Sequence, residues 1–113
     1  MHRHEHEKEG FYIADGQVTV FADDVEQQLS YGGFAFVPRG TPHAFRFDSA
    51  EATLLLLISP GNAGHESMFR EMGEPATEPV IPAPSSGTVD PEMLAAIAER
   101  HGTIIVGPPP PPR

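Results

Sequence analysis

The chain has 113 residues, which is the size of one domain. Its formal charge of −9, from 7 basic and 16 acidic residues, argues against a nucleic-acid or anionic-membrane surface, because both need clustered Lys and Arg. There is no cysteine for a disulfide or a thiolate site, no apolar leader stretch, and no apolar run longer than LLLLI at 54–58, so we expect a soluble, cytoplasmic protein.

The first strand is expected at the start of the chain, where histidine occupies every second position, at His2, His4 and His6. Residues two apart on a strand share a face, so these imidazoles would point the same way. Glu9 lies five residues after His4, an odd offset that a straight strand would place on the opposite face. A turn or bulge between residues 5 and 8 is therefore required to bring the Glu9 carboxylate to the histidines.

Turn signals then recur about every ten residues, a spacing typical of a sandwich or a barrel. We predict a hairpin over 11–22, in which Asp15 and Gly16 both take positive φ, followed by a return strand VEQQL after the Asp23-Asp24 turn. An aromatic strand ends at Pro38, and HAFRF alternates polar and apolar residues as a half-buried strand does. The continuous apolar run ATLLLLIS predicts a strand covered on both faces.

The pattern changes after the last of these strands. A short helix is predicted over 63–73, and a loop over 74–89. Helix signals are complete at 90–102, where Asp90 can cap the first turn and Gly102 can end the helix in the left-handed region. One last strand, TIIV, and an extended polyproline tail, PPPPPR, follow.

Four side chains in this sequence can converge on one metal ion. VPRGTPHAF forms a tight Pro/Gly turn that delivers His43 at the head of a strand. Together with His2, His4 and Glu9 it provides three imidazoles and one carboxylate. This donor set suits a borderline divalent metal such as Fe, Mn, Co, Ni or Zn.

Two spacings carry a resemblance to a known family, H-x-H-x4-E-x6-G and G-x5-P-x-G-x2-H. They are met by His2, His4, Glu9 and Gly16, and by Gly32, Pro38, Gly40 and His43. These patterns resemble the paired motifs of the cupin superfamily, and the stretches around them are similar to small single-domain cupins of the quercetin 2,3-dioxygenase-like subgroup. The resemblance implies an all-β, double-stranded β-helix (jelly-roll) barrel at 1–60 and a helical, Pro-rich extension at 61–113. It assigns His2, His4, Glu9 and His43 to one divalent metal.

The chain departs from the family's pattern in two places. Phe47 stands where the second motif usually has Asn. The strands that usually precede the first motif would lie before Met1, so we expect a barrel that is incomplete at its N-terminus. Another copy of the chain could cover the resulting open sheet edge, which favours a homodimer.

The resemblance implies a metal-dependent dioxygenase acting on a small aromatic or enolic, flavonol-like compound. Glu9 could act as its general base if a low-dielectric pocket raised the pKa of the carboxyl. Three alternatives stay open: a non-catalytic cupin that binds a metal or a small molecule, a metal-dependent isomerase or polyketide cyclase, and an inactive fragment whose missing strands prevent a closed site. His6, His65 and His101 are expected to be exposed or structural residues.

Overall fold

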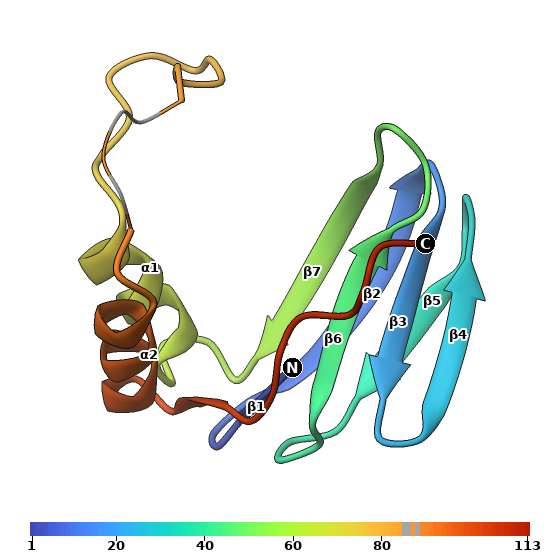
Figure 1. Ribbon diagram of the computed structural model, residues 1–113, viewed down its shortest axis with the longest axis horizontal. Coiled ribbons are helices and arrows are strands. Elements are labelled where there is room, and N and C mark those ends of the chain that lie inside the picture. Colours follow the sequence, from blue (N-terminus) through green and yellow to red (C-terminus); the bar gives the residue numbers. More distant parts are fainter. Residues whose placement is uncertain (85–86, 88) are drawn as a thin grey trace.

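The computed structural model describes residues 1–84, 87 and 89–113, and it consists of two antiparallel sheets with two short helices at one end (Figure 1). The five-stranded sheet has the order β4-β3-β6-β1-β8, and the three-stranded sheet has the order β5-β2-β7. The elements are β1 (His2–His4), β2 (Lys8–Asp15), β3 (Val18–Ala22), β4 (Val25–Leu29), β5 (Phe34–Val37), β6 (His43–Phe47), β7 (Thr53–Ser59), α1 (His65–Met72), α2 (Pro91–Arg100) and β8 (Thr103–Ile105). This architecture confirms the predicted jelly-roll class with two short helices near the C-terminus.

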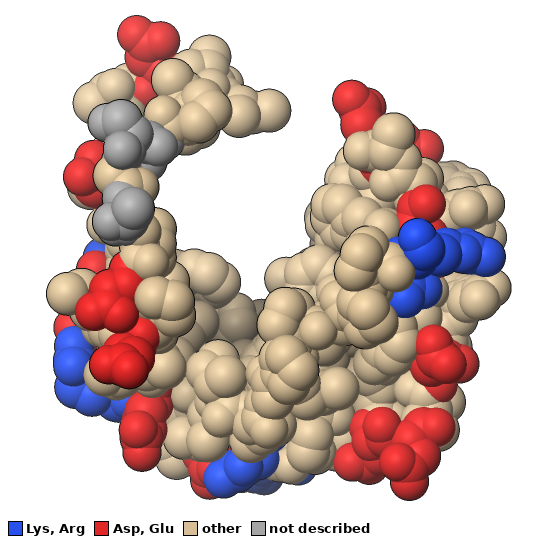
Figure 2. Space-filling model, in the orientation of Figure 1, with Lys and Arg blue, Asp and Glu red and all other residues tan. Residues whose placement is uncertain are grey.

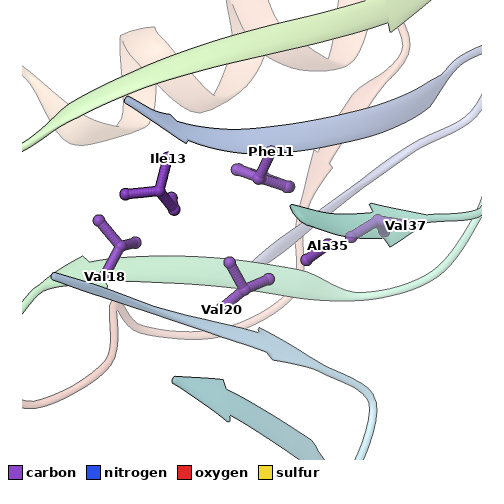
Figure 3. Packing of buried hydrophobic residues seen from close by; sticks show 6 residues of the cluster. All are labelled: Phe11, Ile13, Val18, Val20, Ala35 and Val37. Carbon is purple, nitrogen blue, oxygen red and sulfur yellow. The ribbon is translucent and has the colours of Figure 1, made fainter. Parts of the chain in front are cut away.

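The hydrophobic core lies between the two sheets (Figure 3). Alternate residues of the central strand β2, Phe11 and Ile13, point toward Val18 and Val20 of β3. Phe11 is completely buried. Its position explains the period-2 pattern of β2, because every second side chain faces the opposite sheet. The other buried members of the core are Ala35 and Val37 of β5.

The hairpin predicted over 11–22 is wrong. β2 and β3 follow one another in the chain, but β2 pairs with β5 and β7 while β3 pairs with β4 and β6, so the chain crosses from one sheet to the other at Gly16. Gly16 has φ of 82°, whereas Asp15 is not among the residues with positive φ. A two-residue hairpin turn needs both, and the single left-handed residue here turns the chain between layers. The return strand predicted after Asp23 does pair with β3, as β4.

The prediction that 52–59 is covered on both faces is also wrong. β7 is an edge strand of the three-stranded sheet, and its side chains alternate between the two faces. Leu54 packs against the core, while Leu55 and Leu57 point outward and are 57% and 56% exposed. A run of four leucines cannot by itself distinguish a buried strand from one whose outer face is also apolar.

The segment after β7 forms the two predicted helices and then returns to the sheet. Asp90 caps α2 by accepting a hydrogen bond from the Glu92 backbone N–H, and Gly102 has φ of 86°, as predicted. β8 then pairs with β1 in register, so that β1 lies between β6 and β8 (Figure 1). The division of the chain at residue 60 stays a prediction. β8 lies after this division in the sequence but belongs to the same sheet as β3 and β6.

The structure describes every residue of the polyproline tail, and none of them is in a helix or a strand. The tail runs back along the five-stranded sheet, where Arg46 donates a hydrogen bond to the carbonyl oxygen of Pro111 (Figure 1). Within the described part of the chain, no helix is both long enough and apolar enough to cross a membrane. The cytoplasmic location stays a prediction.

Candidate metal centre

The two neighbouring strands β1 and β6 bring three histidines together. His2 of β1 is paired directly with His43 of β6. His2 and His4 are two residues apart on β1, so they lie on the same face. The imidazole centroids of His2 and His43 are 4.4 Å apart, those of His2 and His4 4.9 Å, and those of His4 and His43 5.1 Å.

Glu9 reaches this group from the opposite sheet. The chain bends at Glu5 and His6, after β1 has ended at His4 and before β2 begins at Lys8. This bend confirms the predicted turn between residues 5 and 8. It moves the chain into the three-stranded sheet, where Glu9 faces inward on the same side of β2 as Phe11.

One carboxylate oxygen connects the three side chains that lie deepest. Oε2 of Glu9 is 3.0 Å from Nε2 of His4 and 2.8 Å from Nε2 of His43. His4, Glu9 and His43 are all at most 3% exposed, and His2 is partly buried beside them. The structure therefore brings together all four predicted ligands, each with one donor atom within 4.8 Å of the others.

The Nδ1 atoms of His4 and His43 contact residues outside the four-residue cluster. Nδ1 of His43 is 2.9 Å from the carbonyl oxygen of Thr41, and Nδ1 of His4 is 3.0 Å from the hydroxyl of Thr103. Hydrogen bonds of this kind fix the orientation of a metal-binding imidazole. Thr103 comes from β8, 99 residues after His4, and no spacing in the sequence pointed to it.

The contacts of His43 require a cation, either a proton or a metal ion, between its Nε2 and the Glu9 carboxylate. A carbonyl oxygen only accepts, so Nδ1 of His43 must donate its hydrogen to Thr41. In a neutral imidazole, Nε2 then carries a lone pair that faces the Glu9 carboxylate oxygen. Two acceptors at 2.8 Å repel each other unless a proton or a metal ion lies between them. Imidazole nitrogens and a carboxylate are the ligands of borderline divalent metals.

The pKa values of His2 and Glu9 are both lowered. Burial, followed by the neighbouring charges of His43 and His4, lowers the pKa of His2 to about 4, so this imidazole is neutral at pH 7. Burial alone would raise the pKa of Glu9, but the hydrogen bonds from His4 and His43 outweigh it and lower the pKa to about 2. The raised pKa on which a general-base role of Glu9 depends is therefore not found, because the histidines stabilise the ionised carboxylate more than burial penalises it.

A cavity of about 510 Å³ opens beside the cluster, between the sheets and the two helices. Its lining includes His2, His4 and Glu9, together with a mainly apolar wall. That wall consists of Phe45, Leu56, Met68, Phe69, Met72, Pro91, Leu94, Ala95, Ala98 and Ile105. In the space-filling view, the hollow between the helices and the strands has few charged atoms on its visible walls (Figure 2).

His65 is a residue of this site that sequence reasoning missed. It was expected to be structural or exposed, but its ring packs against His4, with centroids 5.0 Å apart, and it lines the cavity. Its position follows from the way α1 packs on the open end of the sheets, which no local pattern reveals. His6 is exposed and outside the cluster, as predicted, and His101 forms a hydrogen bond with Glu71.

Comparison with known proteins identifies the family. The Cupin domain family matches residues 1–59. A quercetin 2,3-dioxygenase of Bacillus subtilis (strain 168) is 37% identical over 81 residues, which cover 72% of this chain and 23% of that protein. A quercetin 2,3-dioxygenase of Aspergillus japonicus is 31% identical over 102 residues, covering 80% of this chain and 29% of that protein. The chain thus spans less than a third of the length of either enzyme.

Similarity to solved structures is more limited. A crystal structure of a protein from Thermus thermophilus, 37% identical in sequence, superimposes with a TM-score of 0.49 over 51% of this chain and 56% of that chain.

The lowered pKa values predict that the chain loses stability in acid. His2 releases its proton more readily in the folded chain, with a pKa of about 4 against 6.5, so the unfolded state holds more protons between these pH values. The free energy of unfolding in the presence of a chelator should fall as the pH drops through this window, at up to about 1.4 kcal/mol per pH unit from His2. Glu9 should extend the loss from about pH 4.5 toward pH 2.

Urea denaturation of His2→Gln at several pH values tests this expectation. The variant should show a shallower pH dependence between pH 6.5 and 4, and His6→Gln, which changes an exposed histidine of the same segment, should behave like the unaltered chain. Some slope should remain, because burial also lowers the pKa of His65. An identical slope in His2→Gln and the unaltered chain would contradict the assignment.

Proposed function

This chain belongs to the cupin family, and from that membership we propose that it is a metal-dependent oxygenase of small aromatic or enolic compounds. His2, His4, Glu9 and His43 would hold one divalent ion. The observation that carries the proposal is the buried contact of two imidazole nitrogens with one carboxylate oxygen, beside an apolar cavity. An ion bound there would supply Lewis-acid activation of an enol or phenol oxygen and a redox partner for dioxygen.

The residues of the chain account for binding and orientation of such a substrate. Phe45 and Leu56 line the sheet side of the cavity, and Leu94 lines the α2 side. An apolar slot of this kind binds a flat, weakly polar ring and excludes water from the polar floor. A flavonol-like compound is consistent with these walls, and with the names of the two relatives from Bacillus subtilis and Aspergillus japonicus.

Glu9 is better suited to act as a ligand than as a free base. Its pKa of about 2 makes it a weak proton acceptor at neutral pH, and its Oε2 already faces two imidazoles. A role in proton abstraction would require the carboxylate to leave one of these partners. We therefore place Glu9 in the ligand set first, and in the general-base role only after such a rearrangement.

The alternative functions depend on whether oxygen is consumed. Chemistry of the isomerase or polyketide-cyclase kind would use the same ligands and the same apolar wall without oxygen uptake. A non-catalytic binding cupin would hold the ion or a small molecule without turnover. Oxygen-electrode assays with catechol-like and flavonol-like compounds distinguish the proposed oxygenase from both.

Loss of one ligand should weaken metal-dependent stabilisation. An ion that binds only the folded chain raises the free energy of unfolding by about 2.7 kcal/mol at a hundredfold excess over its dissociation constant. Thermal melts with Fe, Mn, Co, Ni or Zn should therefore shift upward for the unaltered chain and for His6→Ala. For His43→Ala the shift with at least one metal should be lost or much reduced. Equal shifts for His43→Ala and the unaltered chain would show that the four residues do not form the site.

The cavity wall should control substrate affinity without affecting the metal. Leu94 and Met93 are neighbours on α2, but Leu94 lines the cavity, whereas Met93 is 60% exposed and lies outside the cavity lining. Leu94→Gln should raise the KM for a flavonol-like substrate about tenfold, because an amide in the wall is poorly solvated once a ring is bound. Met93→Gln should leave KM unchanged, and both variants should keep full metal occupancy. Equal KM values for the two variants would place the substrate elsewhere.

We also infer that two copies of the chain associate through the outer face of the three-stranded sheet. Two rows of apolar side chains cross this face in register, one from Leu55 through Tyr12 to Phe34 and the other from Leu57 over Gly10 to Phe36. Four of these side chains are exposed, at 49–57%. A contiguous apolar face of this kind is unusual on a monomer, and a second copy offers the same face as its complement.

A charge introduced into this face should separate the copies. Sedimentation equilibrium is expected to give a dimer for the unaltered chain and a monomer for Leu57→Lys, since a desolvated ammonium group in an apolar contact is strongly unfavourable. Val25→Lys provides a matched control, because Val25 is similarly exposed, at 62%, but lies on β4 of the other sheet. If the unaltered chain were a monomer, or if Leu57→Lys were still a dimer, the proposed interface would be wrong.

A further inference from the structure

A second group of metal-ligating side chains lies beside the four-residue cluster and shares one residue with it. The group consists of His4, Glu7 and His65, each with one donor atom within 4.8 Å of those of the other two. Glu7 comes from the bend between β1 and β2, and His65 is the first residue of α1. Neither belongs to the spacings that first indicated a metal site, and the two are 58 residues apart in the sequence.

Glu7 is a buried carboxylate with one unsatisfied oxygen. It is only 3% exposed, and its Oε2 accepts a 3.2 Å hydrogen bond from the backbone N–H of His65. Its Oε1 is buried and has no hydrogen-bond partner among the residues that the structure describes. A buried charged oxygen that has lost water without gaining a donor is strongly unfavourable, so this atom requires a donor or a cation.

His65 also has a buried polar atom without a hydrogen-bond partner among the described residues. Its Nδ1 is also buried and lacks a partner within the described ranges 1–84, 87 and 89–113. The ring is held on two sides, by His4 at a centroid distance of 5.0 Å and by Phe69 at 4.9 Å. Packing thus keeps the imidazole next to Glu7, although no hydrogen bond from its ring to another described residue orients it.

We propose that Glu7 and His65 form a second divalent-cation site, with His4 as the third side chain within reach. One ion can accept electron pairs from both a carboxylate oxygen and an imidazole nitrogen, so it satisfies the two unpartnered groups at once. A site made of one carboxylate and imidazoles suits Zn, Co or Mn. This site is distinct from the proposed oxygenase centre, because Glu7 and His65 provide none of its four ligands.

Sharing of His4 determines how the two sites interact. A neutral imidazole has a single lone pair, so His4 can bind only one ion at a time. Its Nε2 faces Glu9 and its Nδ1 contacts Thr103, which directs it toward the first site. The second ion is therefore held mainly by Glu7 and His65 and binds more weakly, and each ion lowers the affinity of the other through like charge.

Metal stoichiometry tests the proposal. Chelator-treated protein dialysed against increasing Zn²⁺ or Co²⁺ should take up one ion tightly and a second ion more weakly. Glu7→Gln keeps an oxygen that can accept the His65 N–H but removes the negative charge, so it should keep the tight ion and weaken the second at least about tenfold. Glu66→Gln is the matched control, because Glu66 is an exposed carboxylate one residue beyond His65 that pairs with Arg70. It should bind two ions.

Two further variants keep the test decisive. His65→Phe preserves the ring packing against His4 and Phe69 while removing both nitrogens, so it should also lose the weaker ion even if Glu7→Gln folds poorly. His43→Ala should lose the tight ion and retain the weaker one, which separates this proposal from that of the oxygenase centre. Uptake of a single ion by the unaltered chain, or of two ions by His65→Phe with unchanged affinities, would overturn the second site.

Discussion

The contact of one Glu9 oxygen with two imidazoles is the constraint on which the centre of this molecule depends. The carboxylate belongs to the three-stranded sheet, and the imidazoles of His4 and His43 belong to the five-stranded sheet. A buried negative charge is tolerated only when it is compensated, so the two sheets must meet in one relative position for the carboxylate to be stabilised. The same contact lowers the pKa of Glu9 and keeps donor atoms of both sheets aimed at one point.

Segments far apart in the chain contribute different parts of the site. The first 59 residues, which match the Cupin domain family, contain all four candidate ligands of the first centre. The region after β7 supplies the support: Thr103 of β8 contacts His4, and α1 and α2 contribute most of the apolar wall. β8 also pairs with β1, so the strand that carries His2 and His4 has a neighbour on each side. A terminal strand held in this way resists fraying, which keeps His2 beside the other candidate ligands.

His4 occupies the central position among the polar groups. Its ring contacts His2, His43 and His65, and its two nitrogens face Glu9 and Thr103. Glu7 and His65 extend this network from the first cluster toward α1, where one oxygen and one nitrogen lack partners among the described residues. Of these polar groups, five line the same cavity as the apolar side chains: His2, His4, Glu9, His65 and Thr103.

The sequence by itself determined the candidate ligand set, the bend before Glu9 and the caps of α2, because each depends on local geometry: alternation along a strand, an odd offset, a capping side chain. Recurrent turns indicated a sandwich or barrel, and the resemblance of the two motifs to those of cupins indicated the jelly-roll class. Only the tertiary structure decided which strands pair. Gly16 turns the chain from one sheet to the other rather than into a hairpin. Nothing in the run LLLLI distinguishes the exposed leucines of β7 from the partly buried Leu54. Only the tertiary structure could place Thr103 and His65 in the site. They lie 99 and 61 residues after His4, and no sequence spacing predicts a contact over such separations.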